Sequence, residues 1–471
     1  MVGFLNTPEA IAQMGFEVKA DSTKSDSVAV DDTSSIFDQD PYEDKEDDPF
    51  KNDPFFNKPI TDFFDDKPTF NVESEVIRRS FYQLHKKGID YQVDLQNGPY
   101  RTSILYGVFP VLPMVHFNRV SGLHLGFNQD RMQWYNNGFL DIPSVNVHGS
   151  IGYSFGRETW PYMVGMDIIP GRKKRFMMGG EYHNSTTTDD YWRVGLTETS
   201  FTSLFAAYDY LDYYHVEGVG AYTLLRGKRF FEIGAAFLSD EYSSANVNTR
   251  YSFFGKKKTY RPNPNISEGR IQSLYLGGSF NPKELVLLPG FTFRLDLLAE
   301  LAHMSYLESD YSFSRYMLES RTSLRIPPGG MFEWRFRSGM LGGDMPLQRL
   351  FEAGGIGSMR GRSYKEFVGN SMVLNNIQFH FGSPSHSDNE WVDLDNFRIT
   401  LFLDSGWAEV DNGLFDEDKP TSIFGTFSFE ELRHDVGVGL GSDIIRFEMA
   451  WRTEDLESTP VMWIRFNPTF I

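Results

Sequence analysis

Hydrophobic and polar residues alternate along most of the chain after Arg101. In the segment 291–301, apolar residues occupy every second position, and only Leu298 interrupts the polar positions between them. The segment 145–155 follows the same pattern, with Asn, His, Ser and Gly between its mostly apolar positions. A period of two residues predicts β-strands that have one apolar and one polar face.

Segments of this kind recur as far as the C-terminus, and we expect about fifteen or sixteen strands. They lie at or near 120–128, 145–155, 162–168, 175–183, 217–225, 230–239, 270–279, 291–301, 310–325, 331–340, 367–381, 401–410, 433–441, 444–452 and 461–470. Tight connections, such as 226–228 and 327–330, alternate with long polar ones, such as 241–268 and 382–396. Short turns at one end and long loops at the other are typical of transmembrane β-barrels.

The last strand shows the two faces clearly. Met462, Ile464, Phe466 and Phe470 share one side, and the residues between them are mostly polar. No run approaches the ~18 apolar residues that a membrane helix needs. A closed barrel with an apolar face toward lipid and a polar face toward its lumen leaves no backbone group unpaired. The alternative is a strand that packs on a soluble core.

The pattern therefore predicts an all-β fold: a single transmembrane antiparallel β-barrel of about 16 strands, formed by residues 102–471, in a bacterial outer membrane. Outer-membrane lipid is the expected surrounding. A soluble β-sandwich rarely fills so long a stretch with such segments.

The first 70 residues have a different composition. They contain 17 acidic and 6 basic side chains in a chain whose net charge is −19, and they show no sustained period. This predicts a disordered acidic segment, 1–70, and argues against nucleic-acid binding. Asp48-Pro49-Phe50 recurs as Asp53-Pro54-Phe55, in either a solvated linker or a short motif that docks on a partner.

Residues 71–101 predict a lead-in with one short helix, because apolar residues recur at Val76, Ile77, Phe81 and Leu84. The N-terminus lacks the basic start and apolar core of a signal peptide. We therefore expect the numbering to begin at a mature or truncated N-terminus. In an outer-membrane protein of this kind, the N-terminal segment would lie in the periplasm.

Candidate catalytic and metal-binding residues are few. The chain has no cysteine, which excludes disulfides and thiolate sites. Its 10 histidines are scattered, and neither His-Glu-x-x-His nor Gly-x-Ser-x-Gly occurs. We expect no enzymatic activity and no cofactor. Calcium sites at Asp189-Asp190, or at Asp209 and Asp212, are a weaker alternative.

An aromatic cluster and a basic run each allow two interpretations. Trp192, Tyr208, Tyr210, Tyr213 and Tyr214 are expected to form an interfacial girdle or a cap, although a sugar-binding site stays open. The basic run Lys256 to Arg261 is expected to be a solvated loop. Its alternative role is to bind anionic lipopolysaccharide.

Four motifs between residues 350 and 471 follow one another in a characteristic order. Phe351 to Phe381 contains Gly354-Gly355, Met359-Arg360-Gly361 and Gly369-Asn370; Phe402 to Gly406, Arg433 to Trp451 and an aromatic ending at Trp463 to Ile471 follow. This series resembles the C-terminal barrel of the bacterial surface antigen family, the superfamily of BamA/TamA-type outer-membrane barrels and two-partner-secretion transporters.

The chain departs from that family in three places. Arg362 stands where an aromatic residue usually follows Arg-Gly, and the chain ends on Ile471 after Phe470. The first 70 residues are too acidic and aperiodic to form a POTRA module, which normally precedes the barrel. We therefore do not expect this chain alone to capture a substrate.

The resemblance implies two sites. In the first, an inward-folded loop is held by Arg360 and Gly361, with Gly354 and Gly355 shaping the loop and Asp404 as the implied partner of Arg360. A lock needed only for folding is the alternative. In the second, the first strand (120–128) and the last (461–470) meet at a weak seam that opens sideways. Its residues are Gly122, Gly126, Ile464, Phe466, Pro468 and Phe470.

The resemblance also implies a function. A barrel of the protein insertion and translocation superfamily would assist the assembly or export of outer-membrane or secreted proteins, through its lumen or lateral seam. The alternative is a non-catalytic barrel that anchors a multi-protein complex and uses its acidic tail to dock a periplasmic or outer-membrane partner. A passive porin fits less well, because a returning Arg360 loop would block the lumen.

Overall fold

The computed structural model describes most of the chain after residue 110. The described residues are 111–129, 144–170, 176–227, 230–254, 259–282, 284–302, 307–326, 329–382, 397–410, 427, 429–442 and 445–466. The expected acidic segment 1–70 and lead-in 71–101 lie outside them. Pro468 and Phe470 do so as well.

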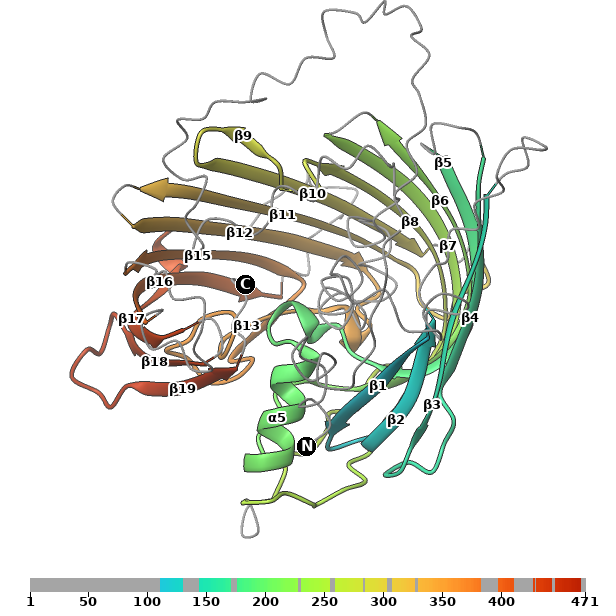
Figure 1. Ribbon diagram of the computed structural model, residues 1–471, viewed down its shortest axis with the longest axis horizontal. Helices are drawn as coiled ribbons and strands as arrows, with labels where there is room; N and C mark the ends of the chain where they lie inside the picture. The colour runs from blue at the N-terminus through green and yellow to red at the C-terminus, as the bar shows by residue number, and fades with distance from the viewer. Residues whose placement is uncertain are drawn as a thin grey trace, which may run out of the picture. The chain divides into compact units, whose positions relative to one another are not determined.

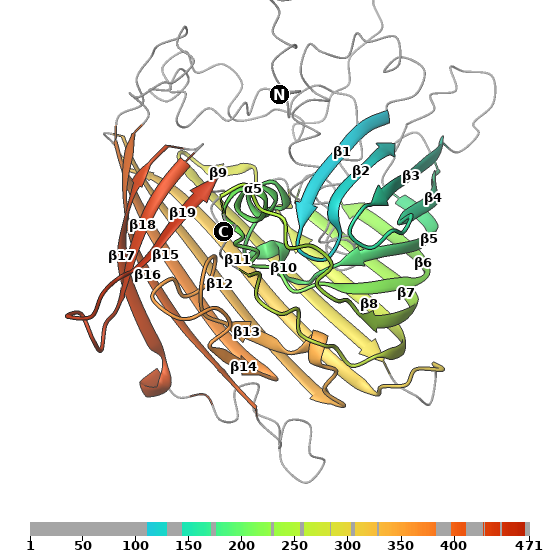
Figure 2. The ribbon, with the colours of Figure 1, turned by 90° about the horizontal axis from the view of Figure 1, so that it is seen from below.

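Within the described residues, seventeen strands form one antiparallel sheet, and sixteen remain when the three-residue strand β9 (Val286–Leu288) is set aside. The sixteen are β1 (Val111–Asn118), β2 (Gly122–Gln129), β3 (Ser144–Ser154), β4 (Tyr162–Ile169), β5 (Phe176–Thr187), β6 (Tyr214–Gly227), β7 (Phe231–Ser244), β8 (Gly269–Phe280), β10 (Phe291–Ala302), β11 (Phe313–Ile326), β12 (Gly330–Gly343), β15 (Ser371–Phe381), β16 (Arg398–Glu409), β17 (Arg433–Gly441), β18 (Ile445–Arg452) and β19 (Val461–Phe466). Each pairs with its neighbour in this order. The sheet curls around the remaining elements (Figures 1 and 2). The expected all-β, barrel-like fold of about sixteen strands is confirmed.

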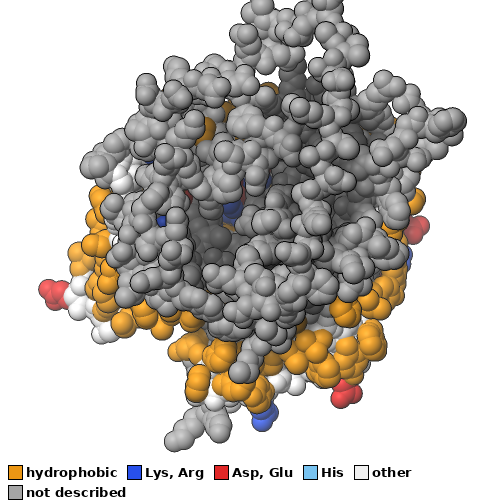
Figure 3. Space-filling model, viewed as in Figure 1, with side chains coloured by type: hydrophobic (Ala, Val, Ile, Leu, Met, Phe, Trp, Pro, Cys, Tyr) orange, Lys and Arg blue, Asp and Glu red, His pale blue; other side chains and the backbone are white. Residues whose placement is uncertain are grey.

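The sheet has an apolar outer face and a polar inner face, which is the reverse of a water-soluble protein. Leu123 and Phe127 of β2 are exposed, whereas His124 and Asn128 are buried. Charged side chains of other strands are buried in the same way: Arg294, Asp296, Glu300, Glu319, Arg335, Arg337, Asp404, Asp435, Glu448 and Arg465. Figure 3 shows hydrophobic side chains gathered along the sides of the molecule.

The apolar surface forms a band that stops part-way along the strands. Phe237 of β7 lies opposite Leu274 of β8 in the last apolar row, and Ser239 lies opposite Gln272 in the next outward-facing row. From this row toward the start of β7 and the end of β8, the outward-facing side chains stay apolar. Leu276 lies in this part of the strand, inside the apolar band. The outer face therefore changes from apolar to polar along the strand direction.

The longest connections lie mainly at one end of the sheet. Residues 188–213, 245–268, 344–370 and 410–432 connect strands at that end, whereas the tight connections 228–230, 327–329 and 442–444 lie at the other. Three connections break the expected alternation: 119–121 is tight at the long-loop end, and 130–143 and 382–397 are long at the tight-turn end. The rule of short turns and long loops therefore holds only in part.

The expected first strand is the second strand of the sheet. β1 precedes it and pairs with it from Val111↔Gln129 to Asn118↔Gly122. Val120 and Ser121 belong to the turn between the two strands. Proline at position 113 obscured β1 in the sequence, because proline cannot donate to a ladder and is confined in sheets to edge or irregular positions.

One α-helix of the described residues lies inside the long connection 188–213. This helix, α5 (Leu196–Ala206), is visible between β1 and β19 in both ribbon views (Figures 1 and 2). No helix among the described residues combines the length and apolar character needed to cross a bilayer.

Candidate functional site

The connection between β12 and β15 folds back inside the sheet. It contains β13 (Phe351–Ala353) and β14 (Phe367–Gly369), which pair only with each other in the ladder. Gly354, Gly355 and Gly357 have φ angles of +113°, +82° and +73°, which L side chains rarely adopt. A Cβ atom on Gly357 would lie 2.2 Å from the carbonyl oxygen of Arg193. This inward loop therefore packs directly on the segment that precedes α5.

Arg360 of the inward loop forms a bidentate ion pair with Asp404 of β16. Its Nε lies 2.7 Å from Oδ2 of Asp404 and its Nη2 lies 2.8 Å from Oδ1. Both side chains are 0% exposed. The Arg360 backbone N–H also donates to Asp404. The structure thus brings together the two residues that the family resemblance had paired, in the planar geometry that a guanidinium offers a carboxylate.

Three further residues fix this pair to the wall. Nη1 of Arg360 lies 3.3 Å from a carboxylate oxygen of Glu448 on β18. The amide of Asn376 on β15 donates to Asp404 at 2.7 Å, and the indole N–H of Trp463 on β19 donates to the carbonyl oxygen of Arg360 at 2.8 Å. Arg360 therefore ties the inward loop to β16, β18 and β19 directly, and Asp404 extends this network to β15.

The unusual Arg362 makes a second ion pair beside the first. Its Nε lies 3.0 Å from Oδ1 of Asp435 on β17, and the backbone N–H of Gly361 donates to Oδ2 of the same carboxylate. Arg362 also bonds Glu454 in the connection after β18. The residue that departs from the family pattern is therefore buried and paired, and Gly361 leaves room for Asp435, which a Cβ would approach to 2.8 Å.

Lys365 joins the inward loop to the connection that contains α5. Its Nζ lies within 2.8 Å of carboxylate oxygens of Asp190, Asp212 and Glu352. Burial disfavours the charged ammonium, but these three carboxylates outweigh it and hold the pKa of Lys365 well above its usual range. The two long connections are thus held together by buried charge.

The acidic residues considered as calcium ligands act as counter-ions. Asp209 pairs with Arg119 at 3.1 Å, and Asp189 pairs with Arg349 at 3.1 Å. Asp190 and Asp212 share Lys365. In the part of the chain that the structure describes, no group of three or more His, Asp or Glu side chains is arranged to hold a metal ion.

The aromatic cluster is mostly internal. Of the five residues expected to form a girdle or cap, only Tyr208 is exposed, while Tyr213 and Tyr214 are buried. Trp192 lies against the buried guanidinium of Arg337, whose central carbon is 4.2 Å from its ring centroid. The expectation of an interfacial girdle is therefore wrong for the buried Tyr213 and Tyr214, whereas the cap stays a prediction.

The basic run contributes to the same internal network. Arg261, its last residue, lies 2.5 Å from a carboxylate oxygen of Asp212. Residues 256–258 lie outside the described residues. Arg261 is therefore a structural cation and not part of a solvated loop.

The two ends of the sheet do not pair with each other within the described residues. β1 pairs with β2 alone, and β19 pairs with β18 alone. Helix α5 contacts both: the backbone N–H of Phe117 on β1 donates to Oγ of Ser200, and that of Phe466 on β19 donates to Oε1 of Glu198, each at 3.1 Å. We call this region, β1, α5 and β19 together, the seam.

The residues expected at the seam are only partly there. Gly122 and Gly126 lie in β2, between β1 and β3, so the expectation that they weaken the seam is wrong. Ile464 and Phe466 lie on β19, and the Ile464 side chain is exposed. The error follows directly from the missed first strand.

Sequence reasoning also missed α5, because the polarity of this helix is inverted. Its buried side chains are polar, including Glu198 and Thr202, and its large apolar ones, Phe201 and Phe205, are exposed. A pattern search for helices looks for a buried apolar stripe. The one available signal was a Leu-Thr-Glu-Thr-Ser-Phe segment without the period of two that marks the strands.

Comparisons with known proteins give structural likeness alone. No protein family and no curated protein matches the chain. Among solved structures, BamA from Haemophilus ducreyi lacking POTRA domains 1–3 is 16% identical, with a TM-score of 0.44, over 75% of this chain and 68% of that one. CdiB from Acinetobacter baumannii and CdiB from Escherichia coli are each 10% identical over 75% of this chain, with TM-scores of 0.38 and 0.37. The chain spans 58% and 61% of those two proteins. At these scores the likeness supports no conclusion on function.

Proposed function

We propose that the chain is an outer-membrane β-barrel of the surface antigen type, which receives β-strands of other outer-membrane or exported proteins at the seam. The observation that carries this proposal is the pair of sheet edges, β1 and β19, that no ladder joins within the described residues. An unpaired edge is a template for an added strand, because its backbone donors and acceptors need partners.

The polarity of the sheet supports a membrane location. Its outer face carries a band of exposed apolar side chains that ends at the row formed by Phe237 and Leu274. Beyond this row stand Gln272 and then Arg270 on the same face. Such a band, with charged side chains facing inward, suits a bilayer core that ends at a polar interface.

The filled interior argues against a passive pore. Arg360, Arg362 and Lys365 of the inward loop are held by buried carboxylates on the wall and on the connection 188–213. An open channel would need this loop to leave the interior. The seam is therefore a better candidate than the lumen for contact with a substrate.

A photo-crosslinking amino acid at position 115 tests the proposal. Val115 lies on β1 and its side chain is 67% exposed. In growing cells, we expect this probe to form adducts with newly made outer-membrane or exported proteins. The matched control is the same probe at Leu276 of β8. This residue also faces outward, but its strand is paired with a neighbouring strand on both sides.

Equal protein adducts at both positions, or none at either, would contradict a strand-receiving seam. An adduct at position 115 with one resident protein, lost when residues 1–70 are deleted, would favour the alternative. In that case the barrel anchors a complex through its acidic tail.

A further inference from the structure

Helix α5 occupies the place where the two sheet edges would otherwise face each other. In both ribbon views it lies between β1 and β19 (Figures 1 and 2). It gives each edge one acceptor, Ser200 Oγ for the N–H of Phe117 and Glu198 Oε1 for the N–H of Phe466. Side chains of the helix thus take backbone donors that a neighbouring strand would take.

The direction of these N–H groups identifies the free edges. In an antiparallel ladder, alternate residues direct their N–H and C=O groups to the same side. Since the N–H of Phe117 points to α5 and away from β2, Val115 and Pro113 direct their backbone to that side too. Proline has no N–H to leave unpaired there, which suits an edge strand. The backbone of β1 is therefore that of an edge strand.

The outward surface of α5 continues the apolar surface of the sheet. Phe201 and Phe205 are exposed, and their rings stack on each other at 5.8 Å. Phe201 also stacks on Phe466 of β19, and Phe205 on Phe253. Tyr251 contacts both Phe253 and Phe117 of β1, so this row of rings spans the gap between the edges. The helix therefore covers the seam toward lipid while its polar side chains face inward.

Discrete polar contacts hold α5 in the seam. Glu198 and Arg465 of β19 form a buried bidentate ion pair, with N–O distances of 2.7 and 3.2 Å. At the other end of the helix, the carbonyl oxygens of Leu204 and Phe205 accept N–H groups of Phe253 and Phe254.

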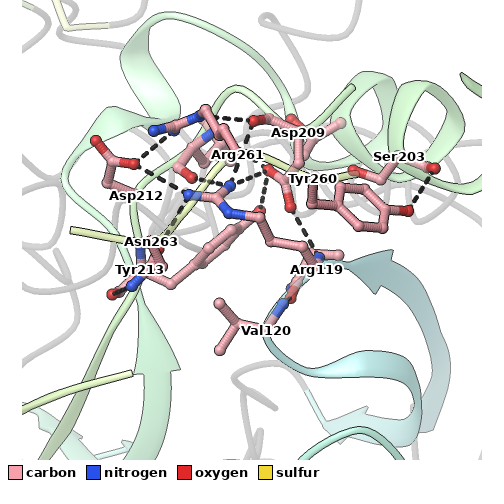
Figure 4. Close-up of polar contacts among 12 residues, drawn as sticks. Arg119, Val120, Ser203, Asp209, Asp212, Tyr213, Tyr260, Arg261 and Asn263 are labelled. Carbon is pink, nitrogen blue, oxygen red and sulfur yellow. Dashed lines mark hydrogen bonds and ion pairs between the residues drawn. The ribbon is translucent and has the colours of Figure 1, made fainter. Parts of the chain in front are cut away.

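A second cluster ties the segment after α5 to the β1–β2 turn. The side chain of Arg119 bonds Asp209, Asp212 and Asn263, and the hydroxyl of Tyr260 donates to the carbonyl oxygen of Ser203 (Figure 4). These contacts use side chains and single backbone groups. None of them is a ladder, so α5 can be released without unpairing any strand of the sheet.

We propose that α5 is a removable seal of the seam, which competes with an incoming β-strand for the backbone donors of β1 and β19. This inference rests on the proposed function and adds its regulation: the seam accepts a strand only when α5 has moved away. The partner that displaces α5 is an extended segment with alternating apolar and polar residues.

A reversible tether between α5 and β19 tests the seal. Phe201→Cys and Phe466→Cys, joined by a short cleavable bis-maleimide, hold the helix in place, and the chain has no other cysteine. With the photo-probe at position 115, we expect the tether to reduce adducts with newly made proteins several-fold and reductant to restore them. The matched control is Phe332→Cys with Phe379→Cys, which tethers two strands that already pair.

Two variants loosen the seal instead. Ser200→Ala removes the acceptor for Phe117 and leaves no buried charge, and Glu198→Gln weakens the pair with Arg465. We expect both to raise the yield of adducts at position 115, provided that the heat-dependent gel mobility of the folded barrel is kept. If the tether cannot form in folded protein, α5 does not lie beside β19 and the inference is wrong.

The outcomes separate this inference from the proposed function. If the yield of protein adducts at position 115 is changed neither by the tether nor by the two variants, α5 is not a seal. The proposal of a strand-receiving seam would still hold. No protein adduct in any variant, including the two loosened ones, would overturn the proposed function and the seal with it.

Discussion

Arg360 of the inward loop and Asp404 of β16 form a fully buried, bidentate ion pair. Removal of one partner leaves the other charge buried and alone, at a cost of about 3–5 kcal/mol. We therefore expect Arg360→Ala to lower the free energy of unfolding by about that amount. Arg360→Lys should cost less, because it keeps the charge but loses the planar two-bond geometry. Urea titration of the barrel folded into vesicles measures both.

An exposed pair on the same wall provides the control. Arg452 bonds Glu366 at 2.8 Å, but its side chain is 37% exposed. Since exposed pairs contribute little, Arg452→Ala should cost less than about 1 kcal/mol. If Arg360→Ala and Arg452→Ala lower the free energy of unfolding equally, the burial of Arg360 does not determine how much its ion pair stabilises the barrel.

The Arg360–Asp404 contact could be anticipated because both residues belong to local motifs of a family resemblance. Its neighbours could not. Arg362 and Asp435 are 73 positions apart, and Glu198 and Arg465 are 267 apart. No periodicity within a strand or loop reveals which distant charge faces which, since that depends on the register of the whole sheet.

The strands themselves were predictable wherever the apolar face is continuous. The alternation in 291–301 marks β10 well, because every outward residue of that strand belongs to the continuous apolar outer face of the sheet. β1 failed this test through Pro113, and α5 failed it through its inverted polarity. Both exceptions lie at the seam. Residues there belong to an edge strand or to the helix between the edges, so they do not follow the pattern of a strand that is paired on both sides.

The second prediction concerns the departure at Arg362. Arg362→Phe restores the aromatic residue that usually follows Arg-Gly, but it removes the ion pair of the buried Asp435. We expect the free energy of unfolding to fall by about 3 kcal/mol or more. The combined variant Arg362→Phe with Asp435→Val should recover part of the loss, as measured by the same titration. A single variant as stable as the parent would refute the pairing.

The third prediction concerns the close approach of the inward loop to the segment before α5. Gly357 has a φ of +73°, and a Cβ there would lie 2.2 Å from the carbonyl oxygen of Arg193. We expect Gly357→Ala to cost more than about 1 kcal/mol, because strain and a backbone clash add. Gly278→Ala is the control, since no atom lies within 4 Å of its Cβ position. Similar stabilities of the two variants, after thermal unfolding in detergent, would contradict the packing.

The last prediction locates the bilayer along a single strand. Leu276 and Gln272 both face outward on β8, but Leu276 lies within the apolar band and Gln272 lies beyond its last row. In a membrane, Leu276→Arg should make the free energy of folding into vesicles less favourable by about 2–4 kcal/mol, whereas Gln272→Arg should cost about 0–1 kcal/mol. Arg270 already occupies the same face two positions before Gln272, so a second arginine there adds little. Equal costs at the two positions would mean that the apolar band does not meet a bilayer core, and that the exposed apolar side chains of the sheet are covered by protein.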